Sequence, residues 1–389
     1  MATLFLIIIY ITFISLGLPD SLLGSAWPVM RLDIGAPLDT AGIIAIIISA
    51  GTVIASLLCN KLITKFGTGR VTLVSVAATA VALLGFSAGQ NVAWLVVMAI
   101  PLGLGAGAVD AALNNYVALH YKAHHMNWLH CFWGVGAFIG PLIMGRFIRQ
   151  NNNWQGGYST ISIIQFCVAA LLLFTLPMWG KQNRPKAAEI PDVVTDVPAR
   201  SAFKIPGVTL ALGTFLLYCG TEYIVGLWGS SFLAEFRGLS ASAAASALSL
   251  YYGGIAVGRL LSGFLSVKFS SKVLIRTGLF IIVCGALLLA LPLPPAFAYT
   301  ALALIGLGCA PVYPSMIHET PRRFGSANSQ KIVGLQMAAA YCGSTFLPPL
   351  VGAVAGRTSL YILPFAALLF AALMLILSER LNIVVAQKQ

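Results

Sequence analysis

Three acidic residues, Asp20, Asp110 and Glu222, lie inside long apolar segments, and two of them occupy matching positions. A glycine follows Asp20 and Glu222 four residues later, and the two acid–glycine pairs coincide when the sequence is shifted by 202 residues. A charged carboxylate at the centre of a membrane helix costs about 2.5 to 3.5 kcal/mol on insertion scales. We therefore expect these carboxyl groups to bind or carry something.

The chemistry expected of these acids is proton transfer. Removal from water favours the neutral form of a carboxyl group, so such a group can load and unload a proton. Sodium binding is the alternative, because carboxylates and backbone carbonyls also suit a hard cation. A structural role is also open, since each carboxyl could stay protonated or bond to a neighbouring serine or threonine. None of the three has a lysine or arginine three or four residues away.

The depths of the three acids are predicted to differ. Asp20 and Glu222 lie about 16 residues past the start of their segments, or roughly 24 Å at 1.5 Å per residue. Asp110 lies a similar distance along a segment that runs the opposite way. Acids at two depths would suit alternating access, with one group nearer each side of the membrane.

The elements that position these residues are membrane helices. The chain has 389 residues, of which 59% are hydrophobic and 9% charged, and its mean hydropathy is +0.90. Soluble domains carry about 25% charged residues, so a soluble enzyme is excluded. Apolar runs long enough to cross a bilayer recur throughout. We predict spans near 3–26, 39–62, 70–89, 92–118, 127–148, 157–179, 206–232, 239–266, 273–293, 296–318, 332–355 and 358–378.

The positive charges behind the net charge of +12 are distributed unevenly between the two predicted faces of the membrane. Most lysines and arginines fall in the even-numbered connections and the C-terminal tail. Those near the other face are Arg31, Arg146, Arg149, Arg237 and Arg357. By the positive-inside rule, both termini are cytoplasmic. We expect an integral protein of a bacterial inner (plasma) membrane, in contact with lipid and without a nucleic-acid partner.

The sequence predicts two halves built from one repeat. Gly51, Leu57, Leu62 and Lys65 match residues 203 places later, and Gly103-Leu104-Gly105 matches Gly306-Leu307-Gly308 at the same offset. The polar stretch 180–205 interrupts the apolar pattern and is predicted to be a cytoplasmic linker. The predicted fold is all-α, with twelve transmembrane helices in two pseudo-symmetric six-helix bundles, 1–179 and 206–389. Parallel repeats of this kind are typical of transporters.

The chain resembles the major facilitator superfamily in the loop between spans 2 and 3. This loop is similar to that family's motif and reads Asn60-Lys61-Leu62-Ile63-Thr64-Lys65-Phe66-Gly67. Lys65 and Gly67 keep the family's basic residue and second glycine, whereas Thr64 replaces its aspartate. The resemblance implies a gating role for Lys65. The replacement of the aspartate by Thr64 affects the charge latch that, in this family, stabilises the outward-open state.

The fourth span narrows the resemblance to the fucose/glucose/galactose:proton symporter family. That family's pattern G-x-G-x-G-x-L-E-x-x-x-N-P is similar to the segment from Gly103 to Asn115. The match places its membrane carboxylate at Asp110 and its asparagine at Asn114, while Asn115 stands where the family has proline. In the fifth span, His130 replaces a glutamine and Trp133 replaces an asparagine implicated in sugar binding. The resemblance therefore supports the coupling carboxylate better than the sugar contacts.

Further polar and aromatic side chains could bind a substrate. Aromatic faces pack against a sugar ring while amides and hydroxyls bind its oxygens. The candidates for substrate binding are Asn114, Asn115, His130, Trp133, Trp228, Tyr223, Tyr313, Gln336 and Tyr341. Each could instead serve in packing or in bonds between helices. Proline is predicted to bend the chain at Pro19, before Asp20, and at Pro311 and Pro314, around Tyr313.

Arg259 is the one basic residue predicted to lie inside a span. It could pair with a carboxylate, but its position near the cytoplasmic end of the eighth span favours snorkelling to that surface as part of a gate. The seven cysteines have no CxxC spacing, so neither disulfides nor a metal site is indicated.

We predict a secondary active transporter, not an enzyme, without a cofactor or metal. The favoured function is proton-coupled symport of a small neutral sugar or polyol by alternating access, carried out by a monomer. The proton-coupling residues would be Asp20, Asp110 and Glu222. Alternatives are sodium-coupled sugar symport, proton-coupled antiport that exports amphipathic compounds, and a membrane receptor or scaffold that does not transport. No nucleotide-binding loop appears, so ATP is not expected to drive transport.

Overall fold

The computed structural model describes residues 2–121, 123–180 and 203–387, and these residues form helices and no strand. Most of the predicted linker lies outside the described residues. Twelve helical stretches are long and apolar enough to cross a membrane, which confirms the predicted number of spans.

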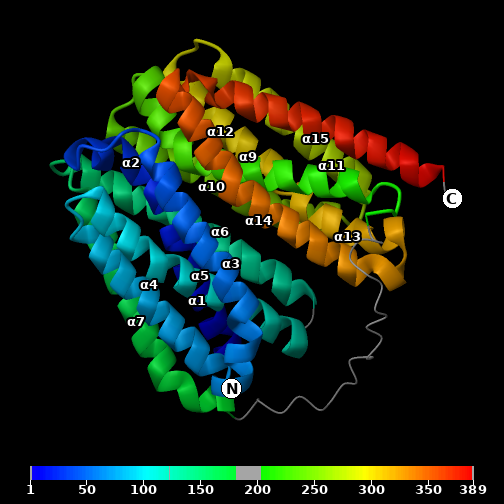
Figure 1. The fold of residues 1–389 in the computed structure, drawn as a ribbon, viewed down its shortest axis with the longest axis horizontal. Helices are drawn as coiled ribbons and strands as arrows, with labels where there is room; N and C mark the ends of the chain where they lie inside the picture. Colours follow the sequence, from blue (N-terminus) through cyan, green and yellow to red (C-terminus); the bar gives the residue numbers. More distant parts are fainter. Residues whose placement is uncertain (1, 122, 181–202, 388–389) are drawn as a thin grey trace.

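The first bundle contains α1–α7 (Figure 1). Its helices are α1 (Ala2–Asp20), α2 (Leu22–Asp33), α3 (Thr40–Phe66), α4 (Thr68–Ser87), α5 (Val92–His120), α6 (Ala123–Arg149) and α7 (Trp154–Gly180). The second bundle contains α9 (Val208–Phe236), α10 (Ala241–Leu265), α11 (Ser271–Ala290), α12 (Pro295–Cys309), α13 (Val312–Phe324), α14 (Ser326–Arg357), a short 3-10 turn (Leu360–Ile362) and α15 (Leu363–Ala386).

Two spans are interrupted where the sequence predicts a bend. The first span breaks at Ser21, directly after Asp20, so that α1 ends on the acid and α2 begins at Leu22. The tenth span breaks between Cys309 and Val312, with Pro311 at the start of α13. Proline lacks a backbone N–H and cannot complete the helical ladder, which explains the breaks. These interruptions lie next to Pro19 and Pro311, where the sequence predicts bends, whereas Pro314 lies within α13.

The sequence repeat reappears as equivalent contacts between helices. Gly136 and Gly343 match at an offset of 207 residues. A Cβ atom on Gly136 of α6 would overlap the carbonyl of Ile14 in α1, and one on Gly343 of α14 would overlap the carbonyl of Leu216 in α9. Gly103 of α5 meets Ile48 in α3 in the same way. Small residues let membrane helices approach this closely. The matching glycines therefore mark the same helix contacts in both bundles.

The two bundles meet at one end and diverge toward the other, where both chain termini lie (Figure 1). At the closed end, Gly24 of α2 packs against the backbone of Gly226 in α9, and Gly42 of α3 packs against Pro349 in α14. An ion pair also crosses the interface there, between Arg31 and Glu235. The structure is thus closed at one end of the interface.

Candidate substrate and proton site

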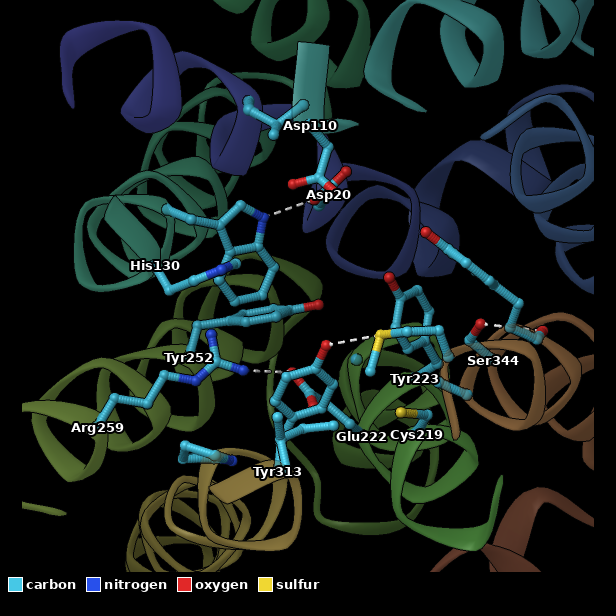
Figure 2. A pocket seen from close by; sticks show the side chains of 18 of the residues that line it. Asp20, Asp110, His130, Cys219, Glu222, Tyr223, Tyr252, Arg259, Tyr313 and Ser344 are labelled. Atoms are coloured by element: carbon cyan, nitrogen blue, oxygen red, sulfur yellow. Dashed lines mark hydrogen bonds and ion pairs between the residues drawn. The ribbon is translucent and has the colours of Figure 1, made fainter. Parts of the chain in front are cut away.

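A cavity of about 1250 Å³ lies between the bundles and is lined from both of them. Near its mouth it is bordered by Tyr121, Met126, Ser271 and Arg322, which lie at or near the ends of α5, α6, α11 and α13 on the side where the bundles diverge. Figure 2 shows the polar side chains that project into it. The cavity brings together many predicted site residues, namely Asp20, Asp110, His130, Trp133, Glu222, Tyr223, Arg259, Tyr313 and Tyr341.

Asp20 is held by the indole of Trp133. Trp133 Nε1 donates a hydrogen bond of 2.7 Å to Asp20 Oδ2. The close contact between α1 and α6 makes this bond possible, because Gly17 of α1 packs directly on the Trp133 backbone. The helix break at Ser21 then leaves Asp20 as the last residue of α1, on the wall of the cavity.

Asp110 is held by Asn114 from the same helix. Asn114 Nδ2 lies 2.8 Å from Asp110 Oδ1 and 2.9 Å from the Asp110 carbonyl oxygen, one helical turn away. Asp110 lies close enough to Asp20 for the two carboxyl groups to interact electrostatically (Figure 2). The two acids therefore line the same chamber.

Glu222 pairs with Arg259 inside the cavity. Arg259 Nη2 of α10 lies 3.4 Å from Glu222 Oε1 of α9, and the two side chains are 17% and 10% exposed. The guanidinium also lies over the Trp133 ring, 5.2 Å from its centroid. Arg259 thus turns toward the carboxylate and the ring, so the expectation that it snorkels to the surface is wrong. Pairing is preferred because an unpaired charge so far from water would be costly.

Other predicted residues line the same chamber. The His130 ring packs edge-on against Phe13, with 5.8 Å between centroids. The Tyr313 hydroxyl lies 3.2 Å from Met337 Sδ, and its ring neighbours Phe215. Tyr223 is 49% exposed and faces the cavity (Figure 2). These groups offer hydroxyls and ring faces to a bound molecule.

Several predicted site residues lie elsewhere. Among the described residues that line the cavity, Asn114, Asn115, Trp228, Gln336 and Lys65 do not appear. Trp228 is fully buried, and its Nε1 donates to the Pro348 carbonyl oxygen at 2.8 Å. Gln336 is also buried and accepts a bond of 2.9 Å from Thr320 Oγ1.

Lys65 lies outside the cavity, at the end of α3. It is exposed, and its Nζ lies 5.2 Å from the centroid of the Phe66 ring. Gly67 follows with a φ of 82°, which allows the sharp turn into α4. Lys65 is therefore placed at the turn between two spans, as the loop motif predicts.

Tyr252 is a cavity residue that the sequence reasoning did not single out. It lines the cavity and packs edge-on against Trp133 at 6.4 Å between centroids. The sequence does contain a signal for it, because Tyr252 lies seven residues before Arg259 and therefore on the same face of the helix. Its neighbour Tyr251 is buried and donates a bond of 2.9 Å to the Glu222 carbonyl oxygen.

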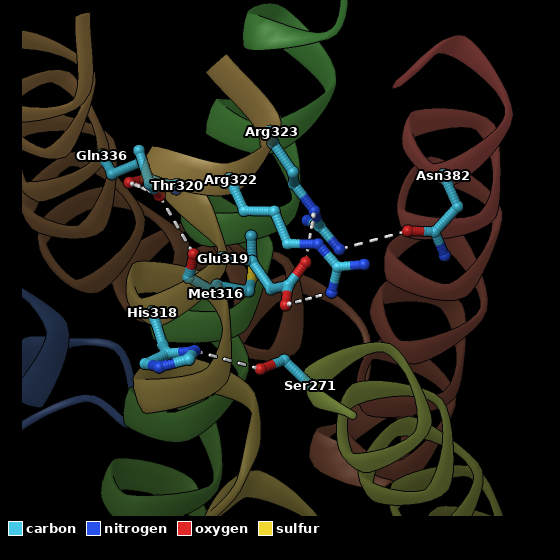
Figure 3. Close-up of polar contacts among 9 residues, drawn as sticks. All are labelled: Ser271, Met316, His318, Glu319, Thr320, Arg322, Arg323, Gln336 and Asn382. Carbon is cyan, nitrogen blue, oxygen red and sulfur yellow. Dashed lines mark hydrogen bonds and ion pairs between the residues drawn. The ribbon is translucent and has the colours of Figure 1, made fainter. Parts of the chain in front are cut away.

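A second polar cluster lies beside the mouth of the cavity (Figure 3). Glu319 of α13 is buried, and its carboxylate lies 3.6 Å from Arg323 Nε and 3.7 Å from Arg322 Nη1. Arg323 also donates to Asn382 Oδ1 of α15 at 3.1 Å. The cluster ties α13 to α15 within the second bundle.

Twelve membrane-spanning helices in two related bundles around a shared cavity are typical of a transporter. The chain belongs to the Major Facilitator Superfamily, whose family model matches residues 9–329 and 210–385. It is accordingly an integral membrane transporter and not an enzyme.

Relatives in sequence include transporters with different cargoes. The chain is 25% identical to the glucose/mannose transporter GlcP of Bacillus subtilis over 319 residues, which cover 78% of this chain and 77% of the relative. It is 23% identical to the cis,cis-muconate transport protein of Acinetobacter baylyi over 245 residues, which cover 60% and 58% of the two chains.

Solved structures share the fold at low identity. The nucleoside transporter NupG has a TM-score of 0.73 at 13% identity, over 97% of this chain and 98% of that one. A bacterial homolog of the human lysosomal transporter Spinster, in an inward-facing and occupied conformation, has a TM-score of 0.69 at 13% identity, over 99% and 95%.

Proposed function

We propose that this transporter is a proton-coupled symporter of a small neutral sugar or polyol. The observation that carries the proposal is the placement of Asp20 and Asp110 together on the wall of one cavity that also holds aromatic rings and hydroxyl groups. In this account the two acids carry the proton, with Glu222 as a third candidate, and the rings and hydroxyls bind the sugar.

The two neighbouring carboxyls suit proton coupling. Like charges close together resist ionisation of both groups, so the pair tends to retain a proton. Asn114 holds Asp110 in place, and Trp133 holds Asp20. A proton shared between groups on α1 and α5 is sensitive to any relative movement of those helices, which is what coupling to transport requires.

A neutral substrate fits the charge of the cavity. Among the described lining residues, Asp20, Asp110, Glu222 and Glu319 outnumber the cations Arg259 and Arg322. The cavity therefore offers a dicarboxylate no surplus of cations, whereas a neutral sugar would meet donors, acceptors and ring faces. The similarity to a glucose/mannose transporter supports the same choice.

Antiport of amphipathic cations is the second candidate. The same excess of acids favours it, together with the aromatic side chains of Trp133, Tyr223, Tyr252 and Tyr313 on the wall. Sodium in place of the proton is a variant of the symport proposal, because carboxylate oxygens can also hold a hard cation.

We further propose that the cavity opens to the cytoplasm. The positive-inside rule places both termini there, and the bundles diverge on that side (Figure 1). Rocking of the bundles would then close the cytoplasmic mouth and open the end held by Arg31 and Glu235. Lys65, at the turn between α3 and α4, and Arg259, between the bundles, are the proposed gating residues.

Transport by the purified protein in liposomes tests the proposal. Labelled glucose, mannose, nucleosides, muconate and a lipophilic cation would each be offered under an imposed pH gradient or sodium gradient. We expect accumulation of a hexose, driven by the pH gradient and abolished by a protonophore. Accumulation driven only by sodium would contradict proton coupling. Exchange of the cation for protons, without hexose uptake, would favour the antiporter.

A further inference from the structure

The ion pair between Arg259 and Glu222 is looser than two other ion pairs that join different helices. Its contact is 3.4 Å, whereas Arg31 lies 2.8 Å from Glu235, and Arg276 donates two bonds of 2.8 Å to Glu379. Charge-assisted bonds of this type normally measure about 2.7 to 2.9 Å. The looseness is unexpected, because the cavity pair is the least exposed of the three.

Arg259 also has a partner in the other bundle. Its guanidinium carbon lies 5.2 Å from the centroid of the Trp133 ring, within the range of a cation–π contact. Arg259 belongs to the second bundle, and Trp133 to the first. One cation is therefore divided between a carboxylate of its own bundle and an aromatic ring of the other.

Trp133 also donates a hydrogen bond, and this bond affects the contact of its ring with Arg259. Its Nε1 donates to Asp20 Oδ2 at 2.7 Å, while its ring face carries Arg259. Donation to an ionised carboxylate polarises the indole and makes the ring face more negative, which strengthens its attraction for a cation. Donation to a neutral carboxyl does so less. The chain of contacts thus runs from Asp20 through Trp133 and Arg259 to Glu222.

We infer that Trp133 is a positioning residue through which the charge state of Asp20 determines how Arg259 is shared between the two bundles. With Asp20 ionised, Arg259 is held over the ring and its bond to Glu222 is long. With Asp20 protonated, the hold of the ring weakens and Arg259 moves closer to Glu222. Proton binding in one bundle thereby changes a contact with the other. This inference deepens and rests on the proposed proton coupling.

Other titratable groups surround Asp20, and their effects on pH dependence have to be distinguished from the effect of Asp20. Asp110 faces it from α5, Tyr223 from α9 and Tyr252 from α10, while His130 lies one turn before Trp133 on α6. On α7, Tyr158 also borders the cavity. Of these groups, Asp110 is the other carboxyl on the first bundle. Asp110→Asn is therefore the matched control for Asp20→Asn.

The first test needs no substrate. Trp133→Phe keeps a ring beneath Arg259 but removes the N–H donor. We expect it to lower the melting temperature of the purified protein more at pH 9 than at pH 5, by about 2 °C. In the Asp20→Asn background this pH dependence disappears, and in the Asp110→Asn background at least half of it remains.

A second control separates this role from the general loss of an indole bond. Trp94 also donates its Nε1 to an acceptor, the Gly85 carbonyl oxygen at 2.7 Å, but does not line the cavity. We expect Trp94→Phe to lower stability equally at both pH values. A pH dependence of Trp133→Phe that persists in Asp20→Asn, or that Trp94→Phe reproduces, overturns the inference.

The transport test separates the inference from the proposed function. In liposomes we expect the proton-to-hexose ratio of Trp133→Phe to fall below half of the parent value, whatever its rate of hexose exchange at equal pH. An unchanged ratio overturns the inference and leaves symport standing. Absence of hexose exchange in the parent overturns the proposed function, and the stability test still decides whether Asp20 and Trp133 are linked.

Discussion

Arg31 Nη2 lies 2.8 Å from Glu235 Oε1, which joins α2 of the first bundle to α9 of the second at the end opposite the cavity mouth. The two residues are 204 positions apart in the sequence. Their side chains are 24% and 31% exposed, so the pair is partly shielded from water. The bond forms part of what holds this end of the interface closed.

Arg31→Gln is expected to increase the fraction of molecules in which this end of the interface is open. A partly exposed ion pair contributes about 0.2 to 1 kcal/mol, so the open population would rise by up to about fivefold. The measurement is the rate at which a membrane-impermeant maleimide, added from that side, modifies Ser49→Cys in a background with the seven native cysteines replaced.

Arg276→Gln is the matched control for that experiment. Arg276 makes an equally short ion pair with Glu379, but both residues belong to the second bundle. It is expected to leave the labelling rate unchanged. Equal acceleration by both substitutions would show that Arg31 does not hold the bundles together.

Neutralising only one member of the Glu222–Arg259 pair is expected to destabilise the protein more than neutralising both. Removal of one partner leaves a poorly solvated charge uncompensated, at a cost of up to about 3 to 5 kcal/mol. We expect the melting temperatures of Glu222→Gln and Arg259→Gln in detergent to be lower than that of the double variant. Additive losses in the double variant would contradict a direct interaction.

A side-chain atom added at Gly136 is expected to disrupt the packing of α1 against α6. A Cβ there would overlap the backbone of Ile14, and such overpacking typically costs about 1 to 3 kcal/mol. Gly136→Ala should lower the melting temperature and reduce proton-driven uptake. Gly334→Ala in α14 is the control, because a Cβ there would have no neighbour within 4 Å. Equal effects of the two substitutions would argue against tight helix packing as the cause.

Loss of the Asn114 amide is expected to weaken coupling at Asp110. A bond to a charged group contributes about 1.5 to 3 kcal/mol, so Asn114→Ala should reduce proton-driven uptake at least tenfold, with less effect on exchange at equal pH. Asn328→Ala is the matched control. Asn328 makes the same type of bond to a carbonyl four residues earlier, but has no carboxylate partner in that bond. A similar loss in both variants would contradict the assigned role.

Much of the fold could be predicted because it depends on local patterns. The twelve spans follow from the length of the apolar runs, and the breaks after Pro19 and at Pro311 follow from proline. Residues repeated at constant offsets predicted two related halves, and repeated glycines lie at equivalent helix contacts in the structure.

The partners of the site residues could not be predicted in the same way. Arg259 and Glu222 are 37 positions apart on different helices, and Trp133 reaches Asp20 over 113 positions. Burial of Trp228 likewise depends on α14, whose Pro348 carbonyl accepts its bond. Such contacts depend on how the helices pack, so sequence spacing indicated which residues are unusual but not what they touch.

The most direct test of the account is the pH of a weakly buffered suspension of liposomes that contain the protein, recorded as hexose is added. Proton-coupled symport predicts that the external medium becomes alkaline as hexose enters, and that this change is absent with Asp110→Asn while exchange at equal pH persists. Hexose uptake without alkalinisation, or uptake that follows a sodium gradient alone, would contradict the central claim.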